Sequence, residues 1–220
     1  MPSSFIPSRL LPALVAAAFL SAAVPSAPAQ FAPPPPGTTV LDASALKPPA
    51  GARVAIVEFA DLECPACAKA NPLLKAAVDK YKIPWVRHDM LIPNHVWSTK
   101  AAVYARWFDA NSKALGDEYR DQVFANQEFI YGPLKLRSFT EEFARSNGIA
   151  LPDSVDPDGL IDAEVHADTD LGRRTGVTHT PTIFVVSTDS KGAHYVEVQF
   201  PDSQLDNAIA QALANSAAAR

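Results

Sequence analysis

The chain has 220 residues, 48% of them hydrophobic, and a formal net charge of −5. This apolar content is sufficient for a folded core of one medium-sized domain. The acidic balance argues against nucleic-acid binding, which normally needs a basic patch, and no run of five or six like charges marks an interaction tail.

Residues 1–29 have the pattern of a secretory signal. Arg9 is the only charged side chain, an apolar run follows over residues 10–20, and small residues up to Ala29 offer a cleavage site. A membrane anchor would need a longer apolar run, and Pro12 interrupts this one. We therefore expect cleavage near Ala29 and export to a periplasm or another oxidising compartment, in which disulfides persist.

Residues 30–51 follow as a proline-rich linker or N-terminal arm. Segments such as "APPPPG" and "KPPAG" favour a stiff, extended chain that forms no core element. Residues 52–217 then have the pattern of one folded domain.

The domain opens with a strand, a helix and a second strand. The β-branched apolar run "RVAIVEFA" predicts a buried strand from about Val54 to Phe59. Pro65 suits the first turn of a helix, because its missing N–H costs nothing there, and the helical pattern continues through "LLKAAVDKY". "IPWVRHDML" supplies the second strand and completes a βαβ unit with a right-handed crossover.

From about residue 94 to residue 176 the pattern is helical. Apolar residues recur at helical spacing in "STKAAVYARWFDAN" and in "GDEYRDQVFANQEFI". Ser138 and Glu141 have the spacing of a capping box at the start of a further helix. In the last helix of the block, Leu160, Val165 and Leu171 lie on or near one face. These consecutive helices between two β-containing segments indicate a helical insertion domain.

The chain closes with two strands and a helix. "PTIFVVSTD" predicts a third strand, and "AHYVEVQF" a fourth, joined as a hairpin by "TDSKG". Leu205, Ile209 and Leu213 then recur at i, i+4 and i+8, as in an amphipathic helix that covers a sheet. The order βαβ, helical block, ββα is that of an α/β thioredoxin-like fold with a helical insertion between its two halves.

The only two cysteines, Cys64 and Cys67, form one C-x-x-C pair. A structural zinc site needs four ligands, and no second cysteine pair or closely spaced histidine pair accompanies these two. A disulfide across two intervening residues closes a very small loop and therefore stabilises little. The pair follows a buried strand and opens a helix, whose unpaired N–H groups and dipole stabilise a thiolate. This position favours a redox centre, with Cys64 as the exposed nucleophile and Cys67 as the shielded partner that resolves a mixed disulfide.

Three acidic residues lie close to the pair in the sequence. Glu58 falls inside the apolar strand. It is either a buried carboxylic acid of raised pKa that exchanges a proton with Cys67, or a strand-end charge that reaches solvent. Asp61 and Glu63 lie in the strand-to-helix turn, where we expect them to be solvated.

Pro181 stands just before the third strand, in "GVTHTPTIFV". A proline at this position is compatible with an ordinary loop. In a thioredoxin-like fold it would instead face the cysteine pair as a cis-proline, and the neighbouring backbone groups would be free to pair with an extended peptide.

Together these features resemble the DsbA-like thiol-disulfide oxidoreductases, an exported family of the thioredoxin superfamily. The resemblance rests on "EFADLECPAC", on "THTPTIFV" and on the helices between them. It implies that Cys64 attacks, that Cys67 resolves, and that Pro181 is the cis-proline. By the same resemblance, Thr180 contacts the cysteine pair, and Glu58 stands where the family often carries its buried glutamate.

The sequence departs from the family between the two cysteines. The dipeptide there is Pro65-Ala66, so the histidine that stabilises the thiolate in strongly oxidising members is missing. We therefore expect a less oxidising centre. His179 stands where relatives commonly have a small residue, and it is either a partial source of the missing positive charge or a neutral loop histidine.

The sequence thus predicts an exported enzyme, a monomeric protein-disulfide oxidoreductase that acts as a thiol oxidase on client proteins with cysteines. The family implies a membrane redox partner that reoxidises it. No binding motif for flavin, nicotinamide or phosphate is evident, so we expect no cofactor or metal beyond the redox-active disulfide of Cys64 and Cys67. A reductase or isomerase is the alternative within the same chemistry. A metal chaperone or a peptide-binding module on the same fold is the alternative from a different class.

Overall fold

The computed structural model describes Met1 and residues 37–218, so the predicted secretory signal lies outside the described residues apart from Met1. The strands are β1 (Val54–Ala60), β2 (Trp85–Asp89), β3 (Thr182–Asp189) and β4 (Gly192–Glu197). The helices are α1 (Pro65–Tyr81), α2 (Ser98–Asn111), α3 (Lys113–Ala125), α4 (Pro133–Ser146), α5 (Leu160–Thr175) and α6 (Pro201–Ala218), with a 3-10 helix η1 (Gln127–Phe129). None of the helices in residues 37–218 is long and apolar enough to cross a membrane.

The four strands form one mixed sheet in the order β2-β1-β3-β4. β1 runs parallel to β2, with Glu58 opposite Arg87, and antiparallel to β3. β3 and β4 form the predicted hairpin. The central strands β1 and β3 are buried along most of their length because both faces of the sheet are covered. The predicted order of elements and the thioredoxin-like fold are therefore confirmed.

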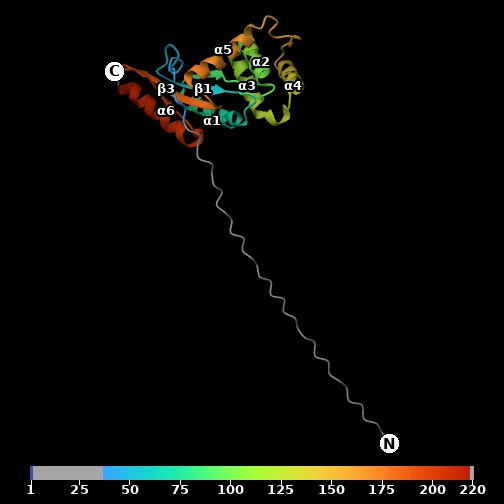
Figure 1. Ribbon diagram of the computed structural model, residues 1–220, viewed down its shortest axis with the longest axis horizontal. Coiled ribbons are helices and arrows are strands. Elements are labelled where there is room, and N and C mark those ends of the chain that lie inside the picture. Colours follow the sequence, from blue (N-terminus) through green and yellow to red (C-terminus); the bar gives the residue numbers. More distant parts are fainter. Residues whose placement is uncertain (2–36, 219–220) are drawn as a thin grey trace. The chain divides into compact units, whose positions relative to one another are not determined.

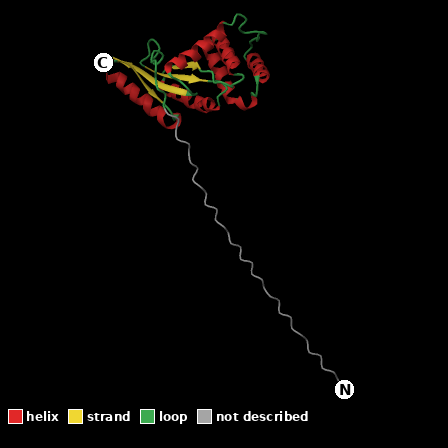
Figure 2. Ribbon diagram, in the orientation of Figure 1, coloured by secondary structure: helices red, strands yellow, loops and turns green. Residues whose placement is uncertain are grey.

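Helices pack on the two faces of this sheet (Figures 1 and 2). On one face, Leu74 of α1 and Ile209 of α6 pack in a cluster with Ile56 of β1. On the other face, α5 comes so close that a Cβ on Gly172 would lie 2.8 Å from the sulfur of Met90. These layers fix α1, and the cysteines at its start, against the end of β1.

The N-terminal arm contributes more to the core than its composition predicts. Residues 37–51 form no helix or strand, as expected. Leu46, however, is completely buried and packs with Val57 and Phe59 of β1. The backbone of Leu41 also donates to the carbonyl of Thr175 at 2.9 Å. The segment thus forms no core element, as expected, but it contributes the side chain of Leu46 to the core.

The helical insertion has its own aromatic core, and α2, α3 and α4 lie together away from α6 (Figure 1). The rings of Phe108, Tyr119 and Phe143 pack with centroids 4.9 to 5.2 Å apart. The hydroxyl of Tyr119 is buried and pairs with that of Thr140 at 2.7 Å. The same apolar cluster includes both cysteines, so the insertion packs directly against the cysteine pair.

Two expectations about the insertion are wrong. Helix α4 begins at Pro133, so Ser138 is inside it and donates its hydroxyl to the carbonyl of Leu134 instead of capping the helix. Leu160 is the first residue of α5 and is 69% exposed, whereas Val165 is fully buried. In both cases the helix boundary differs from the one that the local spacing suggests.

Candidate active site

The two cysteines lie where β1 leads into α1. Cys64 is the N-cap residue in an extended conformation, and Pro65 occupies the first helical turn, as predicted. Cys64 and Cys67 are both free thiols in this structure. Cys67 is fully buried and Cys64 is 8% exposed. Cys64 is thus the more accessible of the two, but it reaches solvent over a much smaller area than expected.

The surroundings of Cys64 favour its thiolate. A hydrogen bond from the Cys67 thiol lowers the pKa of Cys64 to about 5, although burial opposes the shift. A hydrogen bond with the Thr180 side chain and the backbone N–H groups of Cys67 and Ala66 contribute to the same shift. These N–H groups are unpaired because they belong to the first turn of α1.

The surroundings of Cys67 favour its protonated form. Burial raises the pKa of Cys67 far above its usual range, and the hydrogen bond that it gives to Cys64 and the charge of Glu58 raise it further. The first proton to leave the pair therefore leaves Cys64, and the second is held firmly on Cys67.

Glu58 is buried behind the pair, with 1% of its surface exposed. Burial raises the pKa of Glu58 to about 7, against the opposing effects of the Arg87 charge and a hydrogen bond from Trp85. The indole N–H of Trp85 donates to Oε2 at 3.0 Å, and the guanidinium of Arg87 stacks 3.5 Å from the Trp85 ring. Oε1 of Glu58 has no hydrogen-bond partner among the described residues. Of the two interpretations of Glu58, the strand-end charge is wrong and the buried acid agrees with the structure.

The loop before β3 faces the cysteines from the other half of the domain. The peptide bond between Thr180 and Pro181 is cis, and the Cys64 sulfur lies 3.4 Å from the carbonyl oxygen of Thr180. His179 lines a cavity of about 400 Å³ together with Thr180, Pro181 and Ala66. His179 is not among the main groups that lower the Cys64 pKa, so its charge role stays a prediction.

Asp61 is almost completely buried, which contradicts the expectation that it is solvated. Its carboxylate accepts hydrogen bonds from the backbone N–H groups of Glu63 at 2.7 Å and of Ile92 at 2.8 Å. Nδ1 of His95 lies 3.0 Å from the same carboxylate. Asp61 therefore ties the turn between β1 and α1 to the segment that leads into α2.

Two further side chains connect the turn before α1 to the helical insertion. Glu63 accepts hydrogen bonds from the N–H groups of Trp97 and Ser98, at 2.7 and 3.0 Å, and so caps α2 from outside. Gln127 of η1 donates its side-chain amide to the carbonyls of Leu62 at 2.7 Å and Cys64 at 3.1 Å. Sequence reasoning did not identify these roles, because the bonded residues are far apart in the chain.

A buried C-x-x-C pair at a helix N-terminus, next to a cis-proline at the same end of a four-stranded mixed sheet, defines a thioredoxin-fold thiol site. A family model described as "Thioredoxin" matches residues 50–198. The chain belongs to the thioredoxin family.

Solved structures place the chain among DsbA-like folds. Oxidised BdbD from Bacillus subtilis matches with a TM-score of 0.62 and 16% identity, over 81% of this chain and 98% of that chain. The thiol-disulfide exchange protein alpha-DsbA2 from Wolbachia pipientis matches with a TM-score of 0.56 and 17% identity, over 74% of this chain and 83% of that chain. The resemblance predicted from the sequence is thus confirmed in the fold.

One curated relative is a much larger protein. The Na(+)/H(+) antiporter NhaA 3 of Salinispora tropica is 28% identical over 158 residues, which make up 71% of this chain and 24% of that protein. The chain thus matches about a quarter of the length of this relative.

Proposed function

We propose that the protein is an exported protein-disulfide oxidoreductase that exchanges disulfides with client proteins through Cys64 and Cys67, and that it acts mainly as a thiol oxidase. The observation that carries the proposal is the opposite effect of the site on the two thiols: the pKa of Cys64 is lowered to about 5, while that of Cys67 is raised. Such a pair has one good leaving group and one shielded resolving group.

The oxidase cycle begins with the Cys64–Cys67 disulfide. A client thiolate attacks the sulfur of Cys64, the intramolecular S–S bond breaks, and Cys67 leaves with the electron pair and takes a proton, which Glu58 supplies. A second client thiolate then attacks the client sulfur of the mixed disulfide, and Cys64 leaves as a stabilised thiolate. Two electrons pass from the client to the pair, and the client keeps the new disulfide.

The lowered pKa of Cys64 also predicts the strength of the oxidant. A stabilised thiolate stabilises the reduced form, so the reduction potential becomes less negative as the pKa falls. Compared with a thioredoxin-type cysteine with a pKa of about 7, a pKa of about 5 makes the reduction potential less negative by at most roughly 50 mV at neutral pH. The expected potential is then about −220 mV, between the thioredoxin and DsbA types and consistent with the missing histidine.

A reductase is the second candidate, because a potential in this intermediate range also permits it. A centre near −220 mV exchanges electrons in either direction with the glutathione pool, so its partners decide the direction. A membrane redox partner that reoxidises the protein is part of the oxidase proposal. A partner that reduces it is part of the alternative.

Export is proposed from residues 1–29 alone. Expression of the full chain in a bacterium with a periplasm should yield a protein that begins near Gln30, with the cysteines oxidised. A product that keeps its N-terminus and stays in the cytoplasm would contradict export without affecting the thiol chemistry.

Trapping on Cys64 tests the function. In a Cys67→Ala variant, mixed disulfides with exported proteins should accumulate on Cys64, because no resolving thiol removes them. The Cys64→Ala variant is the matched control and should trap none.

Purified enzyme should also oxidise a dithiol peptide faster than it reduces a protein disulfide. The reverse ratio would assign the protein to the reductases, and stoichiometric metal on the two thiols would contradict both.

A further inference from the structure

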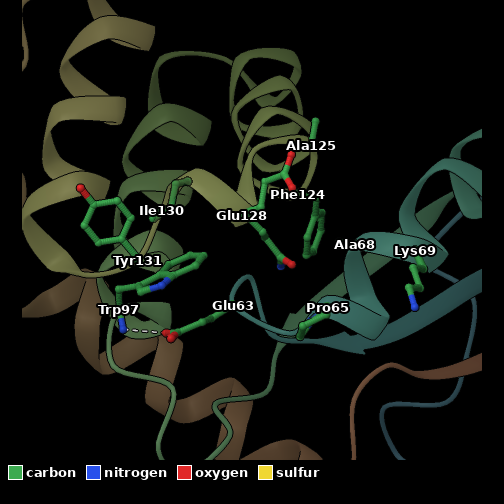
Figure 3. Close-up of a pocket in the computed structure, with 11 residues that line it drawn as sticks. Glu63, Pro65, Ala68, Lys69, Trp97, Phe124, Ala125, Glu128, Ile130 and Tyr131 are labelled. Carbon is green, nitrogen blue, oxygen red and sulfur yellow. Dashed lines mark hydrogen bonds between the residues drawn. The ribbon is translucent and has the colours of Figure 1, made fainter.

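A second cavity opens beside the cysteines, on the side of the helical insertion. It has a volume of about 540 Å³. Its lining consists of Glu63, Pro65, Ala68, Lys69, Trp97, Phe124, Ala125, Gln127, Glu128, Ile130 and Tyr131. In Figure 3, Trp97, Ile130 and Tyr131 lie on one side of it and Pro65, Ala68 and Lys69 on the other. Pro65 follows Cys64 directly, so the lining of the cavity begins one residue after the reacting cysteine, although Cys64 itself is not part of it.

The wall of this cavity is apolar and rigid. Trp97, Phe124 and Ile130 are each at least 93% buried, so their side chains are held in place by the insertion core. Two polar side chains of the lining already have hydrogen-bond partners. The Glu63 carboxylate accepts from the backbone at the start of α2, and the Gln127 amide donates to the turn before α1. The cavity therefore does not depend on a ligand to satisfy these groups.

The charge of the cavity favours a cation. Glu63 and Glu128 place two carboxylates on its lining, and Glu128 has no ion-pair partner among the described residues. Lys69 is the only cation on the lining, and it also lines the cavity beside Pro181. Tyr131 is 75% exposed, and its ring already has the ammonium of Lys135 at 5.4 Å. A further cation can interact with the Glu128 carboxylate and with the aromatic wall.

We propose that this cavity binds the side chain of an arginine or lysine near the reacting cysteine of a client segment. Such a side chain has an apolar stem for the Trp97 and Phe124 wall and a cationic head for Glu128. This inference rests on the proposed function, and it adds a substrate preference to it.

Peptide pairs provide the test. Dithiol peptides that carry arginine, its neutral isostere citrulline, or glutamate near one cysteine are offered to the oxidised enzyme, and kcat/KM is measured. The arginine peptide should react about fivefold faster than the citrulline peptide, and the glutamate peptide should react most slowly. The difference between the arginine and citrulline peptides should shrink at high salt. Glu128→Lys should abolish or reverse this order. Glu118→Lys, an exposed charge reversal on α3 outside the cavity, should keep it.

The outcomes separate the two proposals. Equal rates for all peptides, or an arginine preference that survives in Glu128→Lys, would overturn the basic-residue site and leave the oxidoreductase intact. If no peptide is oxidised, the proposed function fails. The cavity is then tested by nuclear magnetic resonance, through shifts of the Trp97 signals in Cys64→Ser protein titrated with serine-substituted arginine or glutamate peptides. Shifts with the arginine peptide alone support the site, and their absence overturns it.

Discussion

The sheet and the helical insertion handle charge in opposite ways. In the sheet core, Glu58 is the one carboxylate on β1, and its Oε1 has no partner among the described residues. In the insertion, the nearly buried Arg120 holds both oxygens of Asp109, at 2.9 and 2.6 Å. Burial without an ion-pair partner in the described part of the chain raises the pKa of Glu58 to about 7, whereas the ion pair of Asp109 with Arg120 adds a structural link within the insertion.

This difference separates two tasks. The sheet half supplies groups that change protonation state during disulfide exchange, namely the two cysteines and Glu58. The insertion supplies fixed hydrogen bonds, and Gln127 directs two of them at the turn that carries Cys64. Changes in the sheet half should therefore alter pH dependence, and changes in the insertion should alter stability or the geometry of the turn.

The largest expected effect follows from removing the titrating group in the sheet. In Glu58→Gln, Trp85 keeps its acceptor but the proton exchanged with Cys67 loses its carrier, so reoxidation of the enzyme should slow about 100-fold. The rate in the unmodified protein should rise as Glu58 ionises near pH 7, and this step should be absent in the variant. Stopped-flow measurement of tryptophan fluorescence follows the reaction. Glu118→Gln, an exposed change on α3, should keep the unmodified profile, and a Glu58→Gln profile with the same inflection would refute the assignment.

The same variant should be more stable than the unmodified protein at neutral pH. Because the pKa of Glu58 is raised in the folded state from 4.5 to about 7, its proton is bound more tightly there, and stability falls as the pH rises through this interval. The glutamine side chain of the variant does not titrate, so the gain of Glu58→Gln should be absent at pH 4 and reach roughly 3 kcal/mol above pH 7. Urea denaturation of the reduced proteins at several pH values measures it. A gain that does not depend on pH would point to packing instead.

The sheet half was largely predictable from the sequence because its signals are local. The apolar run of β1, Pro65 at the helix start and the C-x-x-C spacing all lie within one short segment. Pro181 required the fold class as well, since nothing in its own segment points to the cysteines. The burial of Glu58 was one of two interpretations, because an acidic residue in an apolar strand can also lie at the strand end.

The insertion was predictable as helices but not in its connections. The capping-box spacing of Ser138 and Glu141 is a local signal for a helix that starts after Ser138. The helix instead starts at Pro133, six residues earlier, because the fixed backbone angle of proline suits a first helical turn. Asp61 was expected to be solvated because it lies in a polar turn, yet the segment before α2 folds over it. The contacts of Gln127 depend on tertiary packing, which no local pattern encodes.

Gly116, inside α3, tests whether a change in the insertion can lower the stability of the protein without changing the thiol site. Alanine at position 116 would normally stabilise a helix by about 1 kcal/mol. Here its Cβ would overlap the carboxyl group of Asp109 and lie 2.9 Å from the carbonyl oxygen of Ala105. Gly116→Ala should therefore displace Asp109 from Arg120 and destabilise the protein by about 2 kcal/mol in urea denaturation. Gly132→Ala, where a Cβ meets nothing within 4 Å, is the control. An unchanged Cys64 pKa in the folded Gly116→Ala protein would support the separation of tasks.

The smallest expected effect lies where the two regions meet. In Gln127→Leu, the carbonyls of Leu62 and Cys64 lose the amide that offsets their negative charge beside the thiolate, so the pKa of Cys64 should rise from about 5 by roughly half to one unit. Gln127→Glu places a carboxylate against the same carbonyls and should raise it further, whereas Gln122→Leu, an exposed change on α3, should leave it unchanged. The ultraviolet absorbance of the thiolate, followed against pH, gives the pKa in each protein. If the values order as glutamate, leucine, then the unmodified protein, from highest to lowest, the insertion tunes the nucleophile through Gln127. If all three coincide, the insertion only supports the turn mechanically.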